Sequence, residues 1–245
     1  MKISKVILLV GVLFFFSCKK EKDRTCFKSY GDVIEVEVPI DSVQKFELFK
    51  GIVYRFYQDT LRKVVIKGGE NVVGLVDVKV KDYMVSVHNG NSCNFLRDYE
   101  DKITVEIHYP HYSSIYAEPT EPMRFMDTLK GGNVKIELRN GGESLDLVAN
   151  LNRLDIEVTY GTGIINAYGS VNFLKLLAQN YGRINALGVS SNDMFIFHNS
   201  SGDILANFTN SNVKSHILGN GDVRYIGVSN SLEITKSGVG EIITY

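Results

Sequence analysis

The first half of the chain alternates apolar and polar residues with a period of two, which predicts β-strands rather than helices. Turn-forming pairs and triplets such as Lys50-Gly51 and Asn89-Gly90-Asn91 separate the alternating segments. The predicted strands cover residues 33–38, 45–49, 52–57, 63–68, 76–80, 83–88 and 102–109. We therefore expect an N-terminal β-sheet region over residues 32–125, with a seam near the proline-containing segment 117–126.

From residue 126 to residue 245 the alternation continues and also repeats at longer range. Five glycines are spaced at intervals of 19, 20, 19 and 19 residues: Gly163, Gly182, Gly202, Gly221 and Gly240. A turn-forming residue stands two positions before each of them, and an aliphatic residue stands two positions after. A repeat of this length is typical of a solenoid, in which each copy buries its apolar side against its neighbours.

These patterns predict an all-β fold, a parallel β-solenoid with coils of 19–20 residues that is continuous with the preceding region. Each coil should contribute two short strands, and the winding should be right-handed, as parallel crossovers are. We expect glycines at the coil corners to permit positive φ. The alternative is an antiparallel sandwich in which the glycine spacing is coincidental.

The last predicted coil ends in residues 240–245 after a single strand. An open sheet edge leaves backbone N–H and C=O groups unpaired, and such an edge invites another strand. We expect this edge to be covered, either by the chain's own N-terminal sheet or by a second copy in a homo-oligomer.

The N-terminus indicates export. Residues 1–17 combine Lys2 and Lys5 with a short apolar run, as a signal peptide does, and Ser17 before Cys18 resembles a lipobox. We expect Cys18 to carry lipid and residues 18–31 to form a flexible tether, because this charged segment has little apolar surface to bury. The predicted location is the cell envelope, as an outer-membrane lipoprotein that faces the periplasm or the cell surface. The alternatives are a plain secretory signal and an uncleaved anchor.

Charge and cysteine content add two constraints. Removing residues 1–17 leaves 25 basic and 28 acidic residues, which argues against nucleic acid as a partner because phosphate binding needs a concentrated basic face. Besides Cys18, only Cys26 and Cys93 remain. In an oxidising compartment they can form a disulfide, and otherwise they are two separate thiols.

Several strings resemble one known family. They are VQKFELFKGIVYRFYQDTLRKVVIKGGENVV (43–73), VKDYMVSVHNG (80–90) and the units Gly202-Asp203-Ile204 and Gly221-Asp222-Val223. They are similar to the auto-transporter adhesin head GIN domains of Bacteroidetes, and the resemblance covers roughly residues 33–245. It implies a β-helical domain on cell-envelope lipoproteins to which no biochemical activity is assigned.

Three acidic residues, Asp203, Asp222 and Glu241, each follow a repeat glycine and should stack as a column. Stacked carboxylates can recruit a cation such as Ca²⁺. The interpretation we favour is that each carboxylate caps N–H groups of its own turn. We therefore expect no metal and no cofactor, and the column is only a weak metal candidate.

The sequence contains none of the common catalytic motifs. His88, His108 and His111 lack the spacing of a zinc site. Only Arg183 and Asp203, at matching positions one coil apart, support the alternative of a polysaccharide-acting β-helix enzyme. We therefore expect a non-catalytic protein.

Two further groups of residues bear on surface chemistry. Four aromatic residues, Tyr160, Tyr168, Tyr181 and Phe197, suit either a glycan- or protein-binding strip or packing within and between coils, and we favour packing. Asp-Ser/Thr-aliphatic triplets make Ser42, Thr60 and Thr128 candidates for O-glycosylation. The predicted function is a lipid-anchored envelope protein with a binding, adhesin-like or structural role, and its partners are a glycan or an envelope protein.

Overall fold

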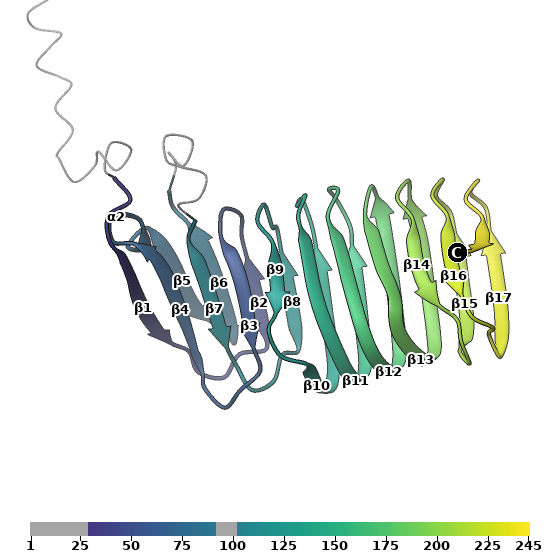
Figure 1. Ribbon diagram of the computed structural model, residues 1–245, viewed down its shortest axis with the longest axis horizontal. Helices are drawn as coiled ribbons and strands as arrows, with labels where there is room; N and C mark the ends of the chain where they lie inside the picture. The colour runs from purple at the N-terminus through teal and green to yellow at the C-terminus, as the bar shows by residue number, and fades with distance from the viewer. Residues whose placement is uncertain (1–28, 92–101) are drawn as a thin grey trace, which may run out of the picture.

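The computed structural model describes residues 29–91 and 102–245. Of the sequence-based predictions, those for residues 1–28 and for Cys93 therefore lie outside the described residues. The fold is a parallel stacked-coil β-solenoid of about seven turns, with 64% strand and 2% helix (Figure 1). The all-β solenoid predicted from the repeat is confirmed. Within the described residues, no helix is long and apolar enough to cross a membrane.

The N-terminal end of the solenoid is closed by antiparallel pairing. Strand β1 (Val33–Pro39) pairs with β4 (Lys63–Gly69), and β4 pairs in turn with β7 (Thr104–His108). Strand β5 (Val76–Lys81) pairs with β6 (Met84–Asn89) in the same antiparallel sense, and the one-turn helix α2 (Glu70–Val73) follows β4. This end of the sheet is therefore covered by strands that do not continue the repeat (Figure 1).

Four strands begin the parallel stacking, and they lie next to the antiparallel end just described, which we call the cap. They are β2 (Lys45–Leu48), β3 (Val53–Tyr57), β8 (Ser114–Ala117) and β9 (Met123–Phe125). Strand β2 lies between β6 and β8, and β3 lies between β7 and β9. Strand β8 then pairs with β10 (Leu129–Leu138), and β9 pairs with β11 (Ser144–Val158). The parallel ladder thus runs without a break across residue 126, where we drew a boundary between the two regions.

The later coils differ in how their strands are divided. In β11, β12 (Ile164–Asn180) and β13 (Arg183–Ser200) one continuous strand covers most of a coil, whereas we expected two short ones. Two short strands per coil occur on either side of these three, as β2 with β3 and β8 with β9 before them. After them come β14 (Ile204–Asn207) with β15 (Asn212–Ile217), then β16 (Val223–Ile226) with β17 (Ser231–Lys236), and finally β18 (Ile242–Thr244).

The core consists of columns of equivalent residues from successive coils. Ile165, Ile184, Ile204 and Val223 stand in register and are at most 1% exposed. Each fully buried aliphatic side chain contributes about 1.5–3 kcal/mol relative to exposure. The columns therefore stabilise the stack coil by coil, and a single coil without neighbours would lose this burial.

The repeat glycines are required for a different reason from the one we expected. Positive φ does occur at Gly161, Gly169 and Gly227, as expected of glycines at turns of the coils. None of the five repeat glycines has it, namely Gly163, Gly182, Gly202, Gly221 and Gly240. Instead, a Cβ on Gly221 would stand 2.5 Å from the carbonyl oxygen of Gly202, and one on Gly182 would stand 2.7 Å from that of Val158. Glycine is needed because the backbones of adjacent coils approach too closely for a side chain.

The C-terminal end of the solenoid is open. Among the described residues, β17 pairs only with β15, and β18 pairs only with β16. Leu232 is 39% and Ile234 48% exposed, although both face the same way as buried core residues of β15. The N-terminal sheet lies at the opposite end (Figure 1), so the expectation that it covers this edge is wrong.

Candidate functional site

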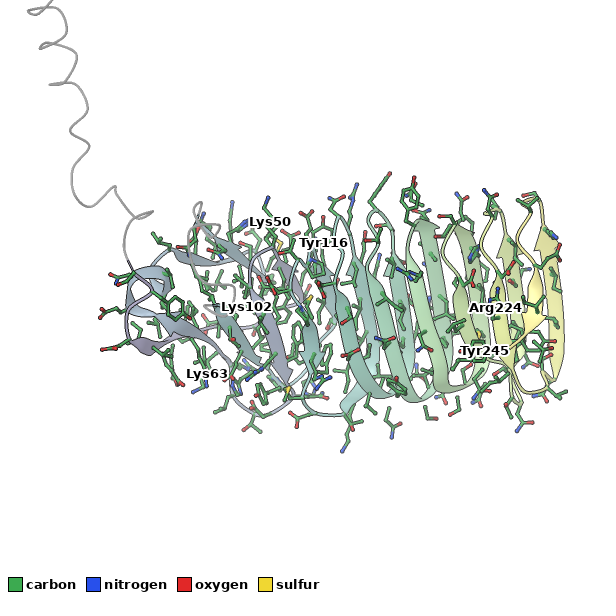
Figure 2. The ribbon with its side chains drawn as sticks, turned by 45° about the horizontal axis from the view of Figure 1, so that its top comes forward. Lys50, Lys63, Lys102, Tyr116, Arg224 and Tyr245 are labelled. Atoms are coloured by element: carbon green, nitrogen blue, oxygen red, sulfur yellow. The ribbon has the colours of Figure 1, made fainter. Side chains whose placement is uncertain are left out.

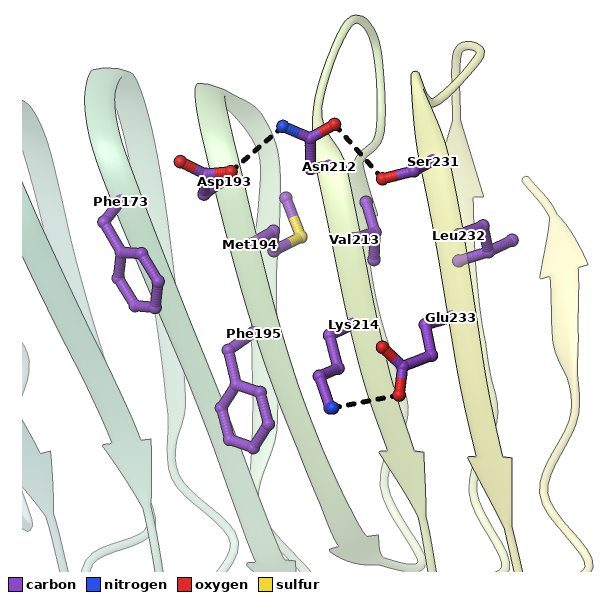
Figure 3. A pocket seen from close by; sticks show the side chains of 10 residues that line it. All are labelled: Phe173, Asp193, Met194, Phe195, Asn212, Val213, Lys214, Ser231, Leu232 and Glu233. Atoms are coloured by element: carbon purple, nitrogen blue, oxygen red, sulfur yellow. Dashed lines mark hydrogen bonds and ion pairs between the residues drawn. The ribbon is translucent and has the colours of Figure 1, made fainter.

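A groove of about 530 Å³ lies on the outer face of the sheet formed by β12, β13, β15 and β17 (Figure 3). Alternation along each strand produces it, because Met194, Val213 and Leu232 turn inward while their neighbours turn outward. One outward row contains Phe173, Asp193, Asn212 and Ser231, and the next contains Phe195, Lys214 and Glu233. We call this set of ten residues the outer-face groove.

The polar groups of the outer-face groove are paired with one another. The Asn212 side-chain amide donates to Asp193 Oδ1 over 3.0 Å, and the Ser231 hydroxyl donates to Asn212 Oδ1 over 3.1 Å (Figure 3). Lys214 Nζ lies 2.9 Å from Glu233 Oε1. Both charges of that pair are solvent-exposed, so its contribution to stability is about 0–1 kcal/mol. The groove therefore presents fixed polar groups, and its one cation, Lys214, is paired, while Asp193 is bonded, among the described residues, only to a neutral amide and keeps its negative charge.

Two phenylalanines supply the apolar surface of the groove. Phe173 is covered on one side by the guanidinium of Arg153, 4.5 Å from the ring centroid. Phe195 makes an edge contact with His216, at 5.4 Å between ring centroids. Both rings stay half-buried, so each is held in place while part of it faces the groove. A concave surface with aromatic rings and a few oriented polar groups is typical of a ligand site.

The two carboxylates of the groove do not form the pair that a glycosidase needs. Such an enzyme uses one protonated acid in a desolvated position and one free carboxylate. Asp193 and Glu233 are both exposed; Asp193 accepts a hydrogen bond from Asn212, and Glu233 forms an ion pair with Lys214. The groove has the features of a binding surface rather than of a hydrolytic centre.

The column of carboxylates is held by backbone and by an arginine. Asp203 Oδ1 accepts the backbone N–H of Asp222 over 2.9 Å, and Asp222 Oδ1 accepts that of Glu241 over 3.0 Å. Each carboxylate thus caps the next coil, whereas we expected it to cap its own turn. Arg224 lies between them, with Nε 2.7 Å from Asp203 Oδ2 and Nη2 3.0 Å from Asp222 Oδ2.

Arg224 was not identified from the sequence, because it stands three residues after the repeat glycine and its reach along the column depends on the stacking. Figure 2 shows it close to Tyr245 at the C-terminal end. Burial raises the pKa of Asp203, but the Asp222 N–H and Arg224 outweigh it and the pKa lies below the ordinary value. Within residues 29–91 and 102–245, no group of three metal-ligating side chains converges.

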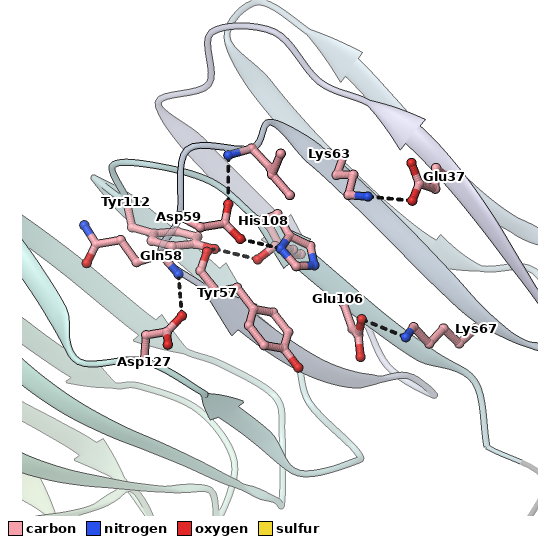
Figure 4. Close-up of polar contacts among 12 residues, drawn as sticks. Glu37, Tyr57, Gln58, Asp59, Lys63, Lys67, Glu106, His108, Tyr112 and Asp127 are labelled. Carbon is pink, nitrogen blue, oxygen red and sulfur yellow. Dashed lines mark hydrogen bonds and ion pairs between the residues drawn. The ribbon is translucent and has the colours of Figure 1, made fainter.

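Two of the predicted O-glycosylation triplets lie together. The backbone N–H of Gln58, beside Asp59, donates to Asp127 Oδ2 over 3.1 Å, which joins the turn that carries Thr60 to the turn that carries Thr128 (Figure 4). Thr60, Thr128 and Ser42 are all exposed outside strands. Their hydroxyls are accessible, and their modification stays a prediction.

The histidines do not come together. His108 Nδ1 lies 2.7 Å from Asp59 Oδ2 and its ring stacks on Tyr57 (Figure 4). This pairing joins residues 49 positions apart and has no sequence signal. His88 stacks on Phe49 with ring centroids 3.8 Å apart, and His111 is exposed.

The aromatic residues of the coil surface are more exposed than we expected. Tyr160 is 49%, Tyr168 48% and Tyr181 64% exposed, so none of them belongs to the core. The Tyr168 ring nevertheless packs over Gly188 of the next coil, and Arg139 lies 4.8 Å from the Tyr160 ring centroid. Phe197 is half-buried on the outer face, in register with His216. Arg183, which we paired with Asp203 by position, lines a second hollow together with Asp203 and Tyr181.

Solved structures share this fold over nearly the whole described chain. A putative adhesin from Bacteroides fragilis NCTC 9343 is 22% identical, with a TM-score of 0.78 over 87% of this chain and 97% of that one. A putative adhesin from Parabacteroides distasonis ATCC 8503 is 16% identical, with a TM-score of 0.66 over 88% and 98%. A putative lipid binding protein from the same organism is 17% identical, with a TM-score of 0.63 over 88% and 97%.

A comparison with curated proteins finds no match. Residues 43–242 match the family described as "Putative auto-transporter adhesin, head GIN domain", which is the family that the sequence strings resemble, and the chain belongs to this family.

Proposed function

We propose that this protein is a lipid-anchored, non-catalytic, adhesin-like protein of the cell envelope that binds an uncharged glycan chain in the outer-face groove. The single observation that carries the proposal is the groove itself, in which two half-buried phenylalanines stand beside a row of amide, carboxylate and hydroxyl groups. Family membership supports an adhesin-like role at the envelope or cell surface.

The chemistry of the groove favours an uncharged, hydroxyl-rich ligand. Its one cation, Lys214, already pairs with Glu233, so no free positive charge in the groove is available to an acidic ligand. Sugar rings have apolar faces that pack on aromatic rings and hydroxyls that exchange hydrogen bonds with amides and carboxylates.

Membrane attachment through Cys18 supplies the location in this proposal. The lipid would hold the N-terminal end of the solenoid near the membrane, while the groove lies in the coils toward the opposite end (Figure 1). The polysaccharide-acting enzyme is the less favoured alternative, because both carboxylates of the groove are exposed and partnered.

We further propose that the partner at the open edge is a second copy. Antiparallel pairing of β17 with itself, centred on Ile234, sets Leu232 opposite Lys236 and Glu233 opposite Thr235. No like charges then face each other, and the exposed Ile234 side chains of the two copies meet. Such pairing would satisfy the free strand edge.

The binding proposal is tested by screening the detergent-solubilised full chain against an array of neutral and charged glycans. We expect retention on neutral oligosaccharides and loss of that retention in Phe195→Ala. A matched control is Phe49→Ala, which removes an equally half-buried phenylalanine at the other end of the solenoid. Retention on no glycan, or equal retention of both variants, would contradict the proposal.

A further inference from the structure

A second hollow lies at the corner between β12 and β13, away from the outer-face groove. Tyr181 occupies this corner and is 64% exposed. At the same position of the preceding and following coils stand Thr162 and Ser201, which are much smaller. The tyrosine ring therefore extends further into solvent than the side chains of Thr162 and Ser201. It borders two hollows, of about 400 and 360 Å³.

The larger of these, which we call the corner hollow, is lined by Thr162, Tyr181, Arg183, Ser201, Gly202 and Asp203. Its volume falls within the range of about 300–1,000 Å³ that small-molecule sites occupy. The hydroxyl of Ser201 donates to the carbonyl of Asn180 over 3.2 Å, which leaves its oxygen able to accept. No hydrogen bond of the Tyr181 hydroxyl occurs among the described residues.

Arg183 is the charged group that sets the chemistry of the corner hollow. Its guanidinium makes no ion pair or side-chain hydrogen bond within the described part of the chain. Its side-chain stem is packed tightly against Gly202, where an added Cβ would stand 2.5 Å from Arg183 Cγ. The glycine thus provides the space that the arginine stem fills, and this contact directs the stem along the hollow.

Asp203 also lines the corner hollow, but its carboxylate is already engaged. One oxygen accepts the Asp222 N–H and the other lies 2.7 Å from Arg224 Nε. Arg224 is shared between Asp203 and Asp222, and Arg183 makes no ion pair with either of them, so its guanidinium stays available to a ligand. In the outer-face groove, by contrast, the one cation, Lys214, is paired with Glu233.

We propose that the corner hollow binds an acidic sugar, a glycan residue that carries a carboxylate. The planar guanidinium of Arg183 matches a carboxylate with two parallel hydrogen bonds. The exposed ring of Tyr181 packs against the sugar ring, and the hydroxyls of Thr162 and Ser201 exchange hydrogen bonds with the sugar hydroxyls. This site is separate from the outer-face groove and does not depend on it.

The test is isothermal titration of the detergent-solubilised full chain with short oligouronates, namely oligogalacturonate, oligoguluronate and oligomannuronate, each compared with its methyl ester. The ester keeps the ring and hydroxyls and removes the charge. We expect at least one oligouronate to bind about tenfold or more tightly than its ester, because a hydrogen bond to a charged group contributes that much. Raising the salt concentration should weaken the binding of the oligouronate and leave the binding of its ester unchanged.

Variants separate the roles of the two residues. Arg183→Gln should abolish the difference between acid and ester, whereas Tyr181→Ala should weaken both. The matched controls are Arg139→Gln and Tyr160→Ala, from another corner where Arg139 lies 4.8 Å over the Tyr160 ring, and they should bind as the unmodified protein does. Unchanged thermal unfolding of Arg183→Gln would show that the fold is intact.

Three results would overturn the inference: no binding of any oligouronate at millimolar concentration, equal binding of acid and ester, or full binding by Arg183→Gln. Phe195→Ala in the outer-face groove should leave oligouronate binding unchanged. Failure of the inference and failure of the proposed function are thus distinguishable.

Discussion

Replacing Gly221 with alanine tests the idea that the repeat glycines exist to let coils stack closely. The new Cβ would stand 2.5 Å from the carbonyl oxygen and 2.8 Å from the carbonyl carbon of Gly202, both backbone atoms that cannot rotate away. Overpacking of this kind costs about 1–3 kcal/mol, and the lower entropy of the unfolded chain returns about 0.4–1 kcal/mol. We expect a net loss of about 1–2 kcal/mol, or a fall in Tm of about 2–8 °C.

Two other glycines provide graded controls. At Gly163 the nearest atom to an added Cβ is the Glu143 carbonyl oxygen at 3.1 Å, so Gly163→Ala should cost less. At Gly74 nothing lies within 4 Å and φ is −65°, so Gly74→Ala should leave stability unchanged or raise it slightly. Thermal and urea unfolding followed by circular dichroism measures all three. If Gly221→Ala were as stable as Gly74→Ala, the stacking argument would be refuted.

Three further predictions concern pH, assembly and modification. Burial lowers the pKa of His198 although the Gly202 carbonyl and Asp203 oppose the shift. The unfolded chain therefore takes up the proton first, and the free energy of unfolding should fall as pH drops below the unfolded pKa of about 6.5. Urea unfolding at pH 7.5 and 5.5 should show a larger fall in this free energy for the unmodified protein than for His198→Gln. Equal falls in the two proteins would exclude His198 as the cause. In analytical ultracentrifugation the unmodified protein should be a dimer and the Ile234→Lys variant a monomer. If the unmodified protein were a monomer at all concentrations, pairing through β17 would be refuted. Intact mass of protein from its native host should exceed the peptide-plus-lipid mass and decrease in Thr60→Ala or Thr128→Ala, whereas an unmodified mass would show that these exposed hydroxyls are not used.

The sequence predicts the solenoid because the same spacing sets both the glycines and the buried aliphatic columns. The strand positions in the first half were also predictable from alternation. The antiparallel cap was not, because the pairing of β1 with β4 depends on which strand edge is free rather than on any local pattern. The reason for the glycines was missed as well, since the closeness of two coils is a property of their stacking and not of either coil alone.

The candidate sites show the same limit. Alternation places Phe173 and Phe195 on the outer face, but they belong to successive coils and neighbouring rows, and only the register sets them along one groove. Arg183 and Asp203 were predicted to lie one coil apart, whereas the engagement of Asp203 by Arg224 depends on a side chain of the next coil, 21 residues further along the chain. Among the described residues, Arg183 keeps an unpaired charge while Arg224 pairs with Asp203, and the spacing of these residues in the sequence does not predict which arginine forms the ion pair.

The measurement that tests the account most directly is the affinity of a neutral oligosaccharide for the full chain and for the double variant Phe173→Ala/Phe195→Ala. The outer-face groove predicts that the unmodified protein binds, that the double variant loses about tenfold or more of its affinity, and that the thermal unfolding of both is cooperative. A double variant that binds as tightly as the unmodified protein would contradict the assignment of the groove as the binding site.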